Sequence, residues 1–212
     1  MTSYTIQIWN QSQAARSYVL FLQQPDLAAN AGSPQVYTNA WATFASVTNG
    51  GFDRITFDET VYAYWSKAPV GSQALSGGVA QVDTQTTDTV AFSGGSPTGF
   101  TTVTSPGSAQ PGSFAIVTGS DFTPSNGYVL GMARMGATPI PVPVMTFPAL
   151  PNMVSSIRPI HTYYVAVGDY QPGEVVDVAL ASVTAEIDFT GRAQTTATVI
   201  QQADGTFSVT YS

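Results

Sequence analysis

The stretch VTAEIDFT, residues 183–190, alternates apolar and polar side chains over its whole length. Because successive side chains of a β-strand point to opposite faces, this pattern predicts a strand with one apolar and one polar face. Residues 4–8 repeat the alternation, as do residues 195–201 and 206–211 on either side of Ala203-Asp204-Gly205. That tripeptide is typical of a hairpin turn. The C-terminal third therefore predicts a sheet.

Working outward, period-two alternation recurs along most of the chain, and sustained helical periodicity does not. Further strands are expected at 17–23, 40–47, 52–57, 60–65, 78–83, 89–92, 113–118, 128–134 and 160–167. Ten to fourteen short strands with little helix predict an all-β fold. We expect a β-sandwich, jelly-roll or immunoglobulin-like, or alternatively a related barrel, with long Gly/Ser/Pro-rich loops.

Residues 93–113 read SGGSPTGFTTVTSPGSAQPGS and break the pattern of strands. Such a stretch is typical of a linker or a long surface loop. Because neither half shows an internal repeat, we expect one β-sandwich domain over residues 1–212. The alternative is two small β domains, 1–92 and 114–212, joined by 93–113.

A second irregular stretch, residues 137–153, contains five prolines, which argue against a helix and against an interior strand. It is nevertheless apolar, and it includes Met145 and Phe147. We interpret it as an extended strap packed over an open end of the core. The functional alternative is an apolar lip over a ligand pocket or a docking surface for another copy.

The composition excludes several classes of site. Only 9% of the 212 residues are charged, the formal net charge is −7, and the chain has one histidine and no cysteine. Zinc, copper and iron sites normally use His or Cys ligands, so we expect no metal site and no cofactor. Six scattered basic residues do not favour nucleic-acid binding.

No apolar run reaches 18 residues, so no transmembrane segment is expected. The N-terminus lacks a basic start followed by an apolar stretch. We therefore expect a cytoplasmic protein, or one exported without a recognisable signal peptide. Asn10-Gln11-Ser12 fits a glycosylation sequon, which by itself is weak evidence for secretion.

His161 is the one imidazole and begins the strand expected at 160–167. One interpretation is a hydrogen-bonded residue at the rim of the core. The functional interpretation makes it a general acid or base, with its tautomer fixed by Asp169 or Glu174 from the following loop. Asp53, Asp58 and Glu59 surround a strand that also carries Arg54, and a surface ion pair accounts for them.

Aromatic side chains lie on both faces of two expected strands. Tyr62 and Tyr64 share one face while Trp65 takes the other, and Tyr163 and Tyr164 point to opposite sides. Rings that the core does not bury suit ligand stacking or subunit contacts. The expected ligand-binding residues are Tyr62, Tyr64, Trp65, Tyr163, Tyr164, Met145 and Phe147.

These features lead to three hypotheses. The first is a non-enzymatic protein that binds a small, largely apolar or sugar-like ligand through aromatic residues, or that associates with itself because few charges protect its strand edges. The second is a cofactor-independent isomerase, cyclase or lyase acting on a small apolar molecule, with His161 as acid or base. The third is a carbohydrate-active protein, either lectin-like or a glycosidase.

Overall fold

The computed structural model describes residues 2–30, 32–67, 77–179 and 183–212. The protein is all-β: 54% of it is strand and 2% is helix. The strands form four open sheets, each with two edge strands, so the fold is sandwich-like rather than one sheet closed on itself. The predicted fold class is confirmed. The described helix is one 3₁₀ turn, η1 (Pro124–Asn126).

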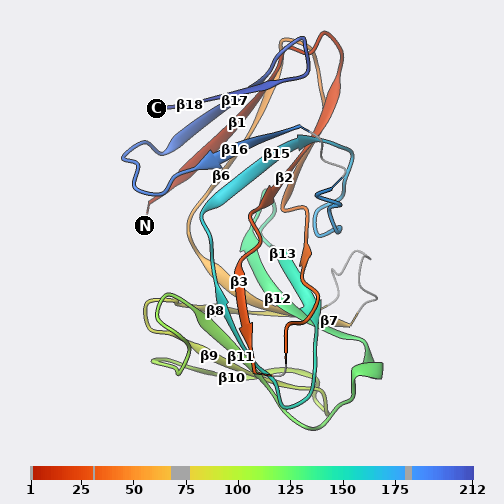
Figure 1. Cartoon of the computed structure of the whole chain (residues 1–212), viewed down its shortest axis with the longest axis vertical. Helices are drawn as coiled ribbons and strands as arrows, with labels where there is room; N and C mark the ends of the chain where they lie inside the picture. Colours follow the sequence, from red (N-terminus) through yellow and green to blue (C-terminus); the bar gives the residue numbers. More distant parts are fainter. Residues whose placement is uncertain (1, 31, 68–76, 180–182) are drawn as a thin grey trace.

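Two of the sheets form the upper part of the molecule in Figure 1. Sheet A has the order β18-β17-β1-β6, and sheet B has the order β16-β15-β2-β5. The strands of sheet A are β1 (Tyr4–Asn10), β6 (Phe52–Phe57), β17 (Thr196–Gln201) and β18 (Phe207–Tyr211). The strands of sheet B are β2 (Arg16–Leu22), β5 (Ala42–Val47), β15 (Thr162–Val167) and β16 (Thr184–Asp188).

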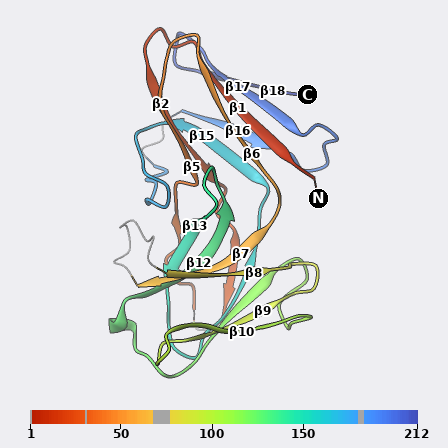
Figure 2. The same ribbon diagram turned by 180° about the vertical axis from the view of Figure 1, so that it is seen from behind.

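The other two sheets form the lower part, which Figure 2 shows from behind. Sheet C has the order β10-β9-β11-β14-β3, and sheet D has the order β4-β13-β12-β7-β8. The strands of sheet C are β3 (Asp26–Ala29), β9 (Thr89–Ser93), β10 (Gly99–Thr104), β11 (Phe114–Thr118) and β14 (Val154–Arg158). The strands of sheet D are β4 (Tyr37–Thr38), β7 (Val61–Lys67), β8 (Gly77–Val82), β12 (Tyr128–Met135) and β13 (Pro141–Pro148).

Alternating apolar residues hold the sheets together in pairs. Between sheets A and B, the Tyr18 hydroxyl donates to Gln201 Oε1 at 2.7 Å within the buried layer. Between sheets C and D, the ring of Phe92 lies 5.4 Å from that of Tyr128, centroid to centroid. One continuous cluster of buried side chains contains residues of all four sheets, so the upper and lower layers share a core.

The chain passes four times between the upper and lower sheets: from β2 to β3, from β4 to β5, from β6 to β7 and from β14 to β15. Side chains at the junction join the two parts of the core. Trp41 packs edge-on against Phe57 of β6 at 4.8 Å and lies 5.6 Å from Tyr163 of β15, both between ring centroids. The indole Nε1 of Trp41 also donates to the Met135 carbonyl of β12 at 3.0 Å. The β4–β5 connection, which carries Trp41, therefore lies against strands of both the upper and the lower sheets.

The Gly/Ser/Pro-rich segment 93–113 is not uniformly irregular. Its residues 99–104 form β10, which pairs with β9 at the edge of sheet C. The part after β10 returns to the turn that precedes β9, where Gly107 N donates to the Thr86 carbonyl at 3.0 Å. Whether the chain behaves as one domain or two stays a prediction.

The proline-rich segment corrects the sequence interpretation. Residues 141–148 form β13, which lies between β4 and β12, so this segment is an interior strand and not a strap. Pro141 and Pro148 occupy its ends, and Pro143 lies at a bulge where the register jumps from Met145 to Pro143. β4 is two residues long, so most of β13 has no partner strand on that side. The backbone N–H groups that its prolines lack are therefore mostly not required for pairing.

The sequon is also explained by packing. Asn10 is fully buried, and its Nδ2 donates to the carbonyls of Ala14 and Val47, both at 2.7 Å. Its Oδ1 accepts the backbone N–H of Ser12. The side chain thus holds the turn between β1 and β2, and its nitrogen is engaged in the folded protein.

Candidate functional site

A cleft of about 530 Å³ opens where the chain passes between the upper and lower sheets. Its walls come from the residues before β1, the β6–β7 and β14–β15 connections, the end of β8 and the β8–β9 turn. Most of the lining side chains carry a hydroxyl, an amide, a carboxylate or an imidazole. The lining residues are Thr2, Glu59, Thr60, Val61, Gln81, Val82, Asp83, Thr84, Gln85, Gly112, Pro159 and His161.

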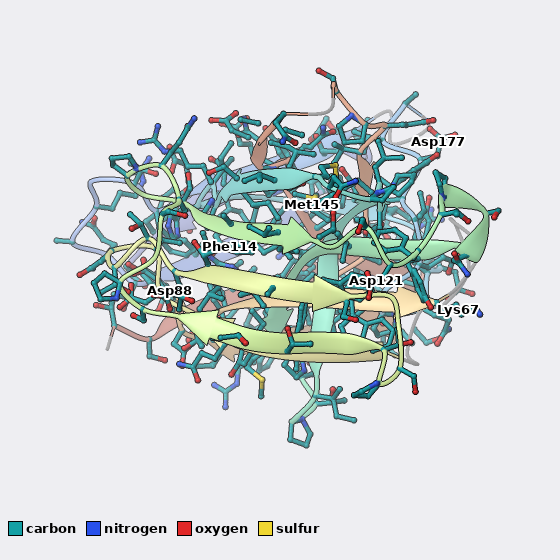
Figure 3. All side chains as sticks on the ribbon, turned by 90° about the horizontal axis from the view of Figure 1, so that it is seen from below. Lys67, Asp88, Phe114, Asp121, Met145 and Asp177 are labelled. Atoms are coloured by element: carbon teal, nitrogen blue, oxygen red, sulfur yellow. The ribbon has the colours of Figure 1, made fainter. Side chains whose placement is uncertain are left out.

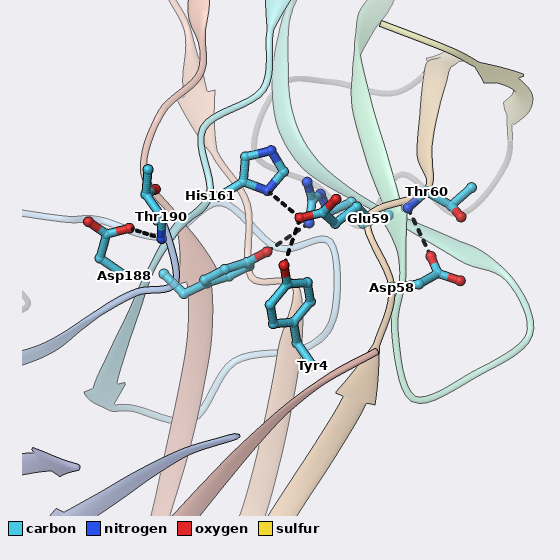
Figure 4. A network of polar contacts seen from close by, with 9 residues as sticks. Tyr4, Asp58, Glu59, Thr60, His161, Asp188 and Thr190 are labelled. Atoms are coloured by element: carbon cyan, nitrogen blue, oxygen red, sulfur yellow. Dashed lines mark hydrogen bonds and ion pairs between the residues drawn. The ribbon is translucent and has the colours of Figure 1, made fainter. Parts of the chain in front are cut away.

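Glu59 and His161 face each other across the two connections (Figure 4). Glu59 Oε1 lies 3.7 Å from His161 Nδ1, and the two side chains are 51% and 39% exposed. The Tyr4 hydroxyl donates to the same Glu59 oxygen at 3.1 Å. A tyrosine of β1 therefore fixes the carboxylate that stands beside the imidazole.

Two effects keep His161 neutral near pH 7. Burial disfavours the charged imidazolium, and the positive charge of Arg134 adds to this, so the pKa of His161 lies below its ordinary value of 6.5. The carboxylates of Glu59 and Asp188 oppose the shift without cancelling it. A neutral imidazole offers the cleft one donor and one acceptor.

The expected result of a nuclear magnetic resonance titration follows directly. His161 is the chain's one histidine, so its ring protons give one resolvable curve. We expect a midpoint below 6.5, and a still lower midpoint in Glu59→Gln, because that change removes a carboxylate that raises the pKa. A midpoint above 6.5 would contradict this electrostatic description.

The β8–β9 turn forms a firm wall of the cleft. Asp88 is buried, and its carboxylate accepts the Asp83 backbone N–H at 2.9 Å and the Thr86 hydroxyl at 2.7 Å. Burial alone would raise the pKa of Asp88, but hydrogen bonds from Ser105, Thr86 and Asp83 outweigh it and lower the pKa. Figure 3 shows Asp88 at one end of the sheet C layer, with Asp121 at the other. The turn therefore positions Asp83, Thr84 and Gln85 with little freedom.

The carboxylates of the cleft have no cationic partner. Within the described ranges, no Lys or Arg nitrogen lies within 4 Å of a carboxylate oxygen. The surface ion pair expected between Arg54 and its acidic neighbours is therefore wrong: Asp53 Oδ1 instead accepts the backbone N–H of Arg54. With His161 neutral, Glu59 and Asp83 give the cleft a negative charge.

A comparison with known protein families shows to which family the chain belongs. The sequence profile of the family described as RhiA matches residues 1–212. The chain belongs to the RhiA family. No curated protein matches the chain. No solved structure matches it.

In this RhiA-family chain, the loop carboxylates predicted to orient His161 lie elsewhere. Glu174 Oε2 accepts the Gln171 backbone N–H at 2.9 Å, and the Glu174 carbonyl accepts the N–H of Ala40. Asp169 is exposed in the same loop, which covers the outer face of sheet B. Neither carboxylate comes within 4 Å of an imidazole nitrogen, and Glu59 is the carboxylate that does.

The aromatic candidates of β7 lie away from the cleft. Tyr62 is half-buried and Tyr64 is buried, and both pack with Ala133 in a small separate cluster. Trp65 is half-buried and packs against the main core, 5.5 Å from Phe92. A ligand-binding role for these three rings stays a prediction.

The remaining candidates divide between core and surface. Tyr163, Met145 and Phe147 are almost fully buried in the main core. Tyr164 takes the opposite face, as predicted, where it stacks on Phe21 and donates to Glu186 Oε2 at 3.2 Å. It lines a second, more apolar pocket of about 330 Å³.

Sequence reasoning missed Tyr4, and it interpreted Glu59 as a surface ion pair. Glu59 is 102 positions before His161, and only the crossing of two connections brings them together. The one signal in the sequence was the acidic pair Asp58-Glu59, which follows the strand at 52–57. Among the described residues, no group of three metal-binding side chains is found, and no helix is long and apolar enough to cross a membrane.

Proposed function

We propose that this protein is a non-enzymatic binding protein that takes a small, hydroxyl-rich, sugar-like ligand into the cleft beside Glu59 and His161. The observation that carries the proposal is the lining: hydroxyl, amide, carboxylate and imidazole groups converge there from four separate parts of the chain. The volume of about 530 Å³ falls within the range of small-molecule sites.

The chemistry of the lining favours a hydroxylated ligand over an apolar one. Carboxylate oxygens accept from ligand hydroxyls, whereas Gln81 and Gln85 both donate and accept. Burying these groups against a hydrocarbon would leave them unpaired at about 1–3 kcal/mol each. Apolar contact comes from Val61, Val82 and Pro159.

Glu59 is the residue on which binding should depend most. The Tyr4 hydroxyl holds one of its oxygens, and no cation neutralises the charge, so the carboxylate is a preset acceptor. The negative cleft also disfavours phosphorylated or carboxylated sugars, because like charges repel.

The test is isothermal titration calorimetry with a panel of neutral mono- and disaccharides. For a sugar that binds, we expect Glu59→Gln to weaken affinity by about 10- to 100-fold, since hydrogen bonds to charged groups contribute most. Glu186→Gln is a matched control, because Glu186 also accepts a tyrosine hydroxyl but lies outside the cleft. No binding across the panel, or equal losses in both variants, would refute the proposal.

One observation favours a second candidate, a cofactor-independent enzyme with His161 as acid or base. The neutral imidazole lies beside a carboxylate and remains 39% exposed at the cleft. The carboxylate that would orient the imidazole is then Glu59, in place of Asp169 or Glu174. Time-resolved proton spectra of each bound ligand decide the matter: conversion that His161→Gln abolishes favours the enzyme, and an unchanged ligand favours binding alone. Self-association stays a prediction.

A further inference from the structure

The second pocket lies where the outer face of sheet B meets the end of β2 and strand β4. Its volume is about 330 Å³, and its lining shares no described residue with the cleft. Apolar side chains are combined there with a few hydroxyl and amide groups. The lining residues are Phe21, Leu22, Gln23, Gln24, Thr38, Tyr164, Val178 and Thr184. This volume is at the lower end of the range of small-molecule sites, so it fits a molecule of one or two rings.

An aromatic ring forms one wall of this pocket. Tyr164 of β15 stacks on Phe21 of β2, with 5.7 Å between the ring centroids and 26° between the ring planes. Phe21 is 2% exposed and supports Tyr164 from the sheet. The Tyr164 hydroxyl donates to Glu186 Oε2 at 3.2 Å, which holds the other end of the side chain. The ring is therefore oriented before a ligand arrives, and this lowers the entropic cost of binding.

The connection between β15 and β16 supplies another wall. Its backbone is tied to β4 and the residues after it: Val176 N donates to the Thr38 carbonyl at 2.9 Å, and Ala40 N donates to the Glu174 carbonyl at 2.8 Å. Val176 is buried, whereas Val178 is 50% exposed and lines the pocket. Covering this apolar side chain with a ligand removes it from water and is favourable.

Thr38 is the polar group that indicates a ligand. It is 8% exposed and lines the pocket. Among the described residues its hydroxyl makes no hydrogen bond, but unlike the hydroxyls of Ser66 and Ser155 it is not sealed from solvent. Polar groups this deeply placed are nearly always paired. A ligand that brings one hydrogen-bonding group into the pocket would supply the missing partner.

We propose that this pocket binds a small, uncharged aromatic molecule, which lies against Tyr164 and Val178 and forms a hydrogen bond with Thr38 Oγ1. A planar ring gains more from the Tyr164 ring than an aliphatic chain does. The carboxylate of Glu186 at the Tyr164 hydroxyl disfavours anionic aromatic molecules, because like charges repel. The site is independent of the sugar-like ligand proposed for the cleft, since the two linings are separate.

Calorimetric titration with indole as the probe tests the proposal. We expect Tyr164→Ala to weaken the binding of indole by about tenfold or more, because the stacked ring and its apolar contact area are lost. Tyr170→Ala is the matched control and should leave the affinity unchanged, since Tyr170 packs on the same face of sheet B but does not line the pocket. No binding of indole, or equal losses in both variants, would overturn the proposal.

A pair of ligands tests the role of Thr38. 1-Methylindole lacks the N–H donor of indole, so the unaltered protein should bind indole more tightly by about three- to tenfold. In Thr38→Val, which keeps the shape of the side chain but lacks the hydroxyl, this preference should disappear. The same preference in both proteins would show that Thr38 does not contact the ligand, and the assignment would be wrong.

Nuclear magnetic resonance with the unaltered protein locates the probe. Nuclear Overhauser effects should connect indole protons with the Tyr164 ring, and the His161 titration curve should stay the same with and without indole, because the imidazole lies in the cleft. A displaced His161 curve without contacts to Tyr164 would place indole in the cleft and overturn the proposal. A protein dimer that dissociates in Tyr164→Ala, with no indole bound, would assign the pocket to a second copy and overturn it as well.

Discussion

Trp41→Ala is expected to lower the free energy of unfolding by about 3–5 kcal/mol, the usual cost of emptying a large buried aromatic site. Trp41 is 1% exposed and joins the upper and lower parts of the core. Its ring packs against Phe57 and Tyr163, which belong to different sheets and cannot easily move together to fill the space. Urea unfolding followed by circular dichroism measures the change.

Two further variants show how much of this loss comes from the Trp41 hydrogen bond and how much from its position at the junction. Trp41→Phe keeps an aromatic ring but leaves the Met135 carbonyl without its donor, so we expect a smaller loss of about 1–2 kcal/mol. Trp9→Ala removes a half-buried ring that stacks on Phe52 at 4.6 Å on the outer face of sheet A, and should cost less than Trp41→Ala. Similar losses for Trp9→Ala and Trp41→Ala would show that Trp41 is not the junction residue described here.

Gly131→Ala is expected to prevent sheet D from forming as described, and so to abolish or severely reduce soluble folded protein. A Cβ at Gly131 would lie 1.9 Å from the Met145 carbonyl oxygen and 3.0 Å from Thr146 Cα. Both are backbone atoms of β13, so relief requires moving a strand rather than a side chain. The cost should exceed the 1–3 kcal/mol typical of overpacking by added methylenes.

Gly136→Ala is the matched control, five positions further along the chain. There a Cβ would meet Val142 Cγ2 at 3.4 Å and the Trp41 carbonyl oxygen at 3.5 Å, which are tolerable contacts. We expect near-normal expression and a change of less than about 1 kcal/mol. If the two alanine variants had equal stability, the close approach of β12 and β13 would be wrong.

Alternation predicted most strands because it depends on neighbouring residues alone. The strands at 4–10, 184–188, 196–201 and 207–211 follow the expected pattern, and more buried residues alternate with less buried ones along them. What alternation could not supply was pairing. The upper sheets combine segments from both ends of the chain, and nothing local specifies that β1 lies between β6 and β17.

The proline-rich strand shows why a local rule failed. Five prolines argue against an interior strand when every residue must donate to a neighbour. β13 escapes this because β4 pairs with Met145 and Thr146 alone, and because a bulge absorbs Pro143. The length of the neighbouring strand decides the outcome, and that length is not visible within residues 137–153.

The candidate site was predictable in part. His161 stood out because of its type, but its partner depends on how distant connections cross. Sequence proximity favoured Asp169 and Glu174, whereas the fold brings Glu59 to the imidazole and directs Glu174 to its own loop. Similarly, Arg134 is one of five arginines in the sequence. It is buried because the upper and lower sheets meet around it, which no local pattern indicates.

The parallel pairing of β1 with β17 has a consequence for synthesis on the ribosome. Thr5 pairs with Thr196, so the inner strand of sheet A waits for nearly the whole chain before one of its two neighbours exists. Contacts this distant in sequence slow folding. Until then the strand that carries Ile6 and Ile8 lacks one of its two neighbouring strands, and the nascent chain is a candidate client for chaperones that shield unpaired strands.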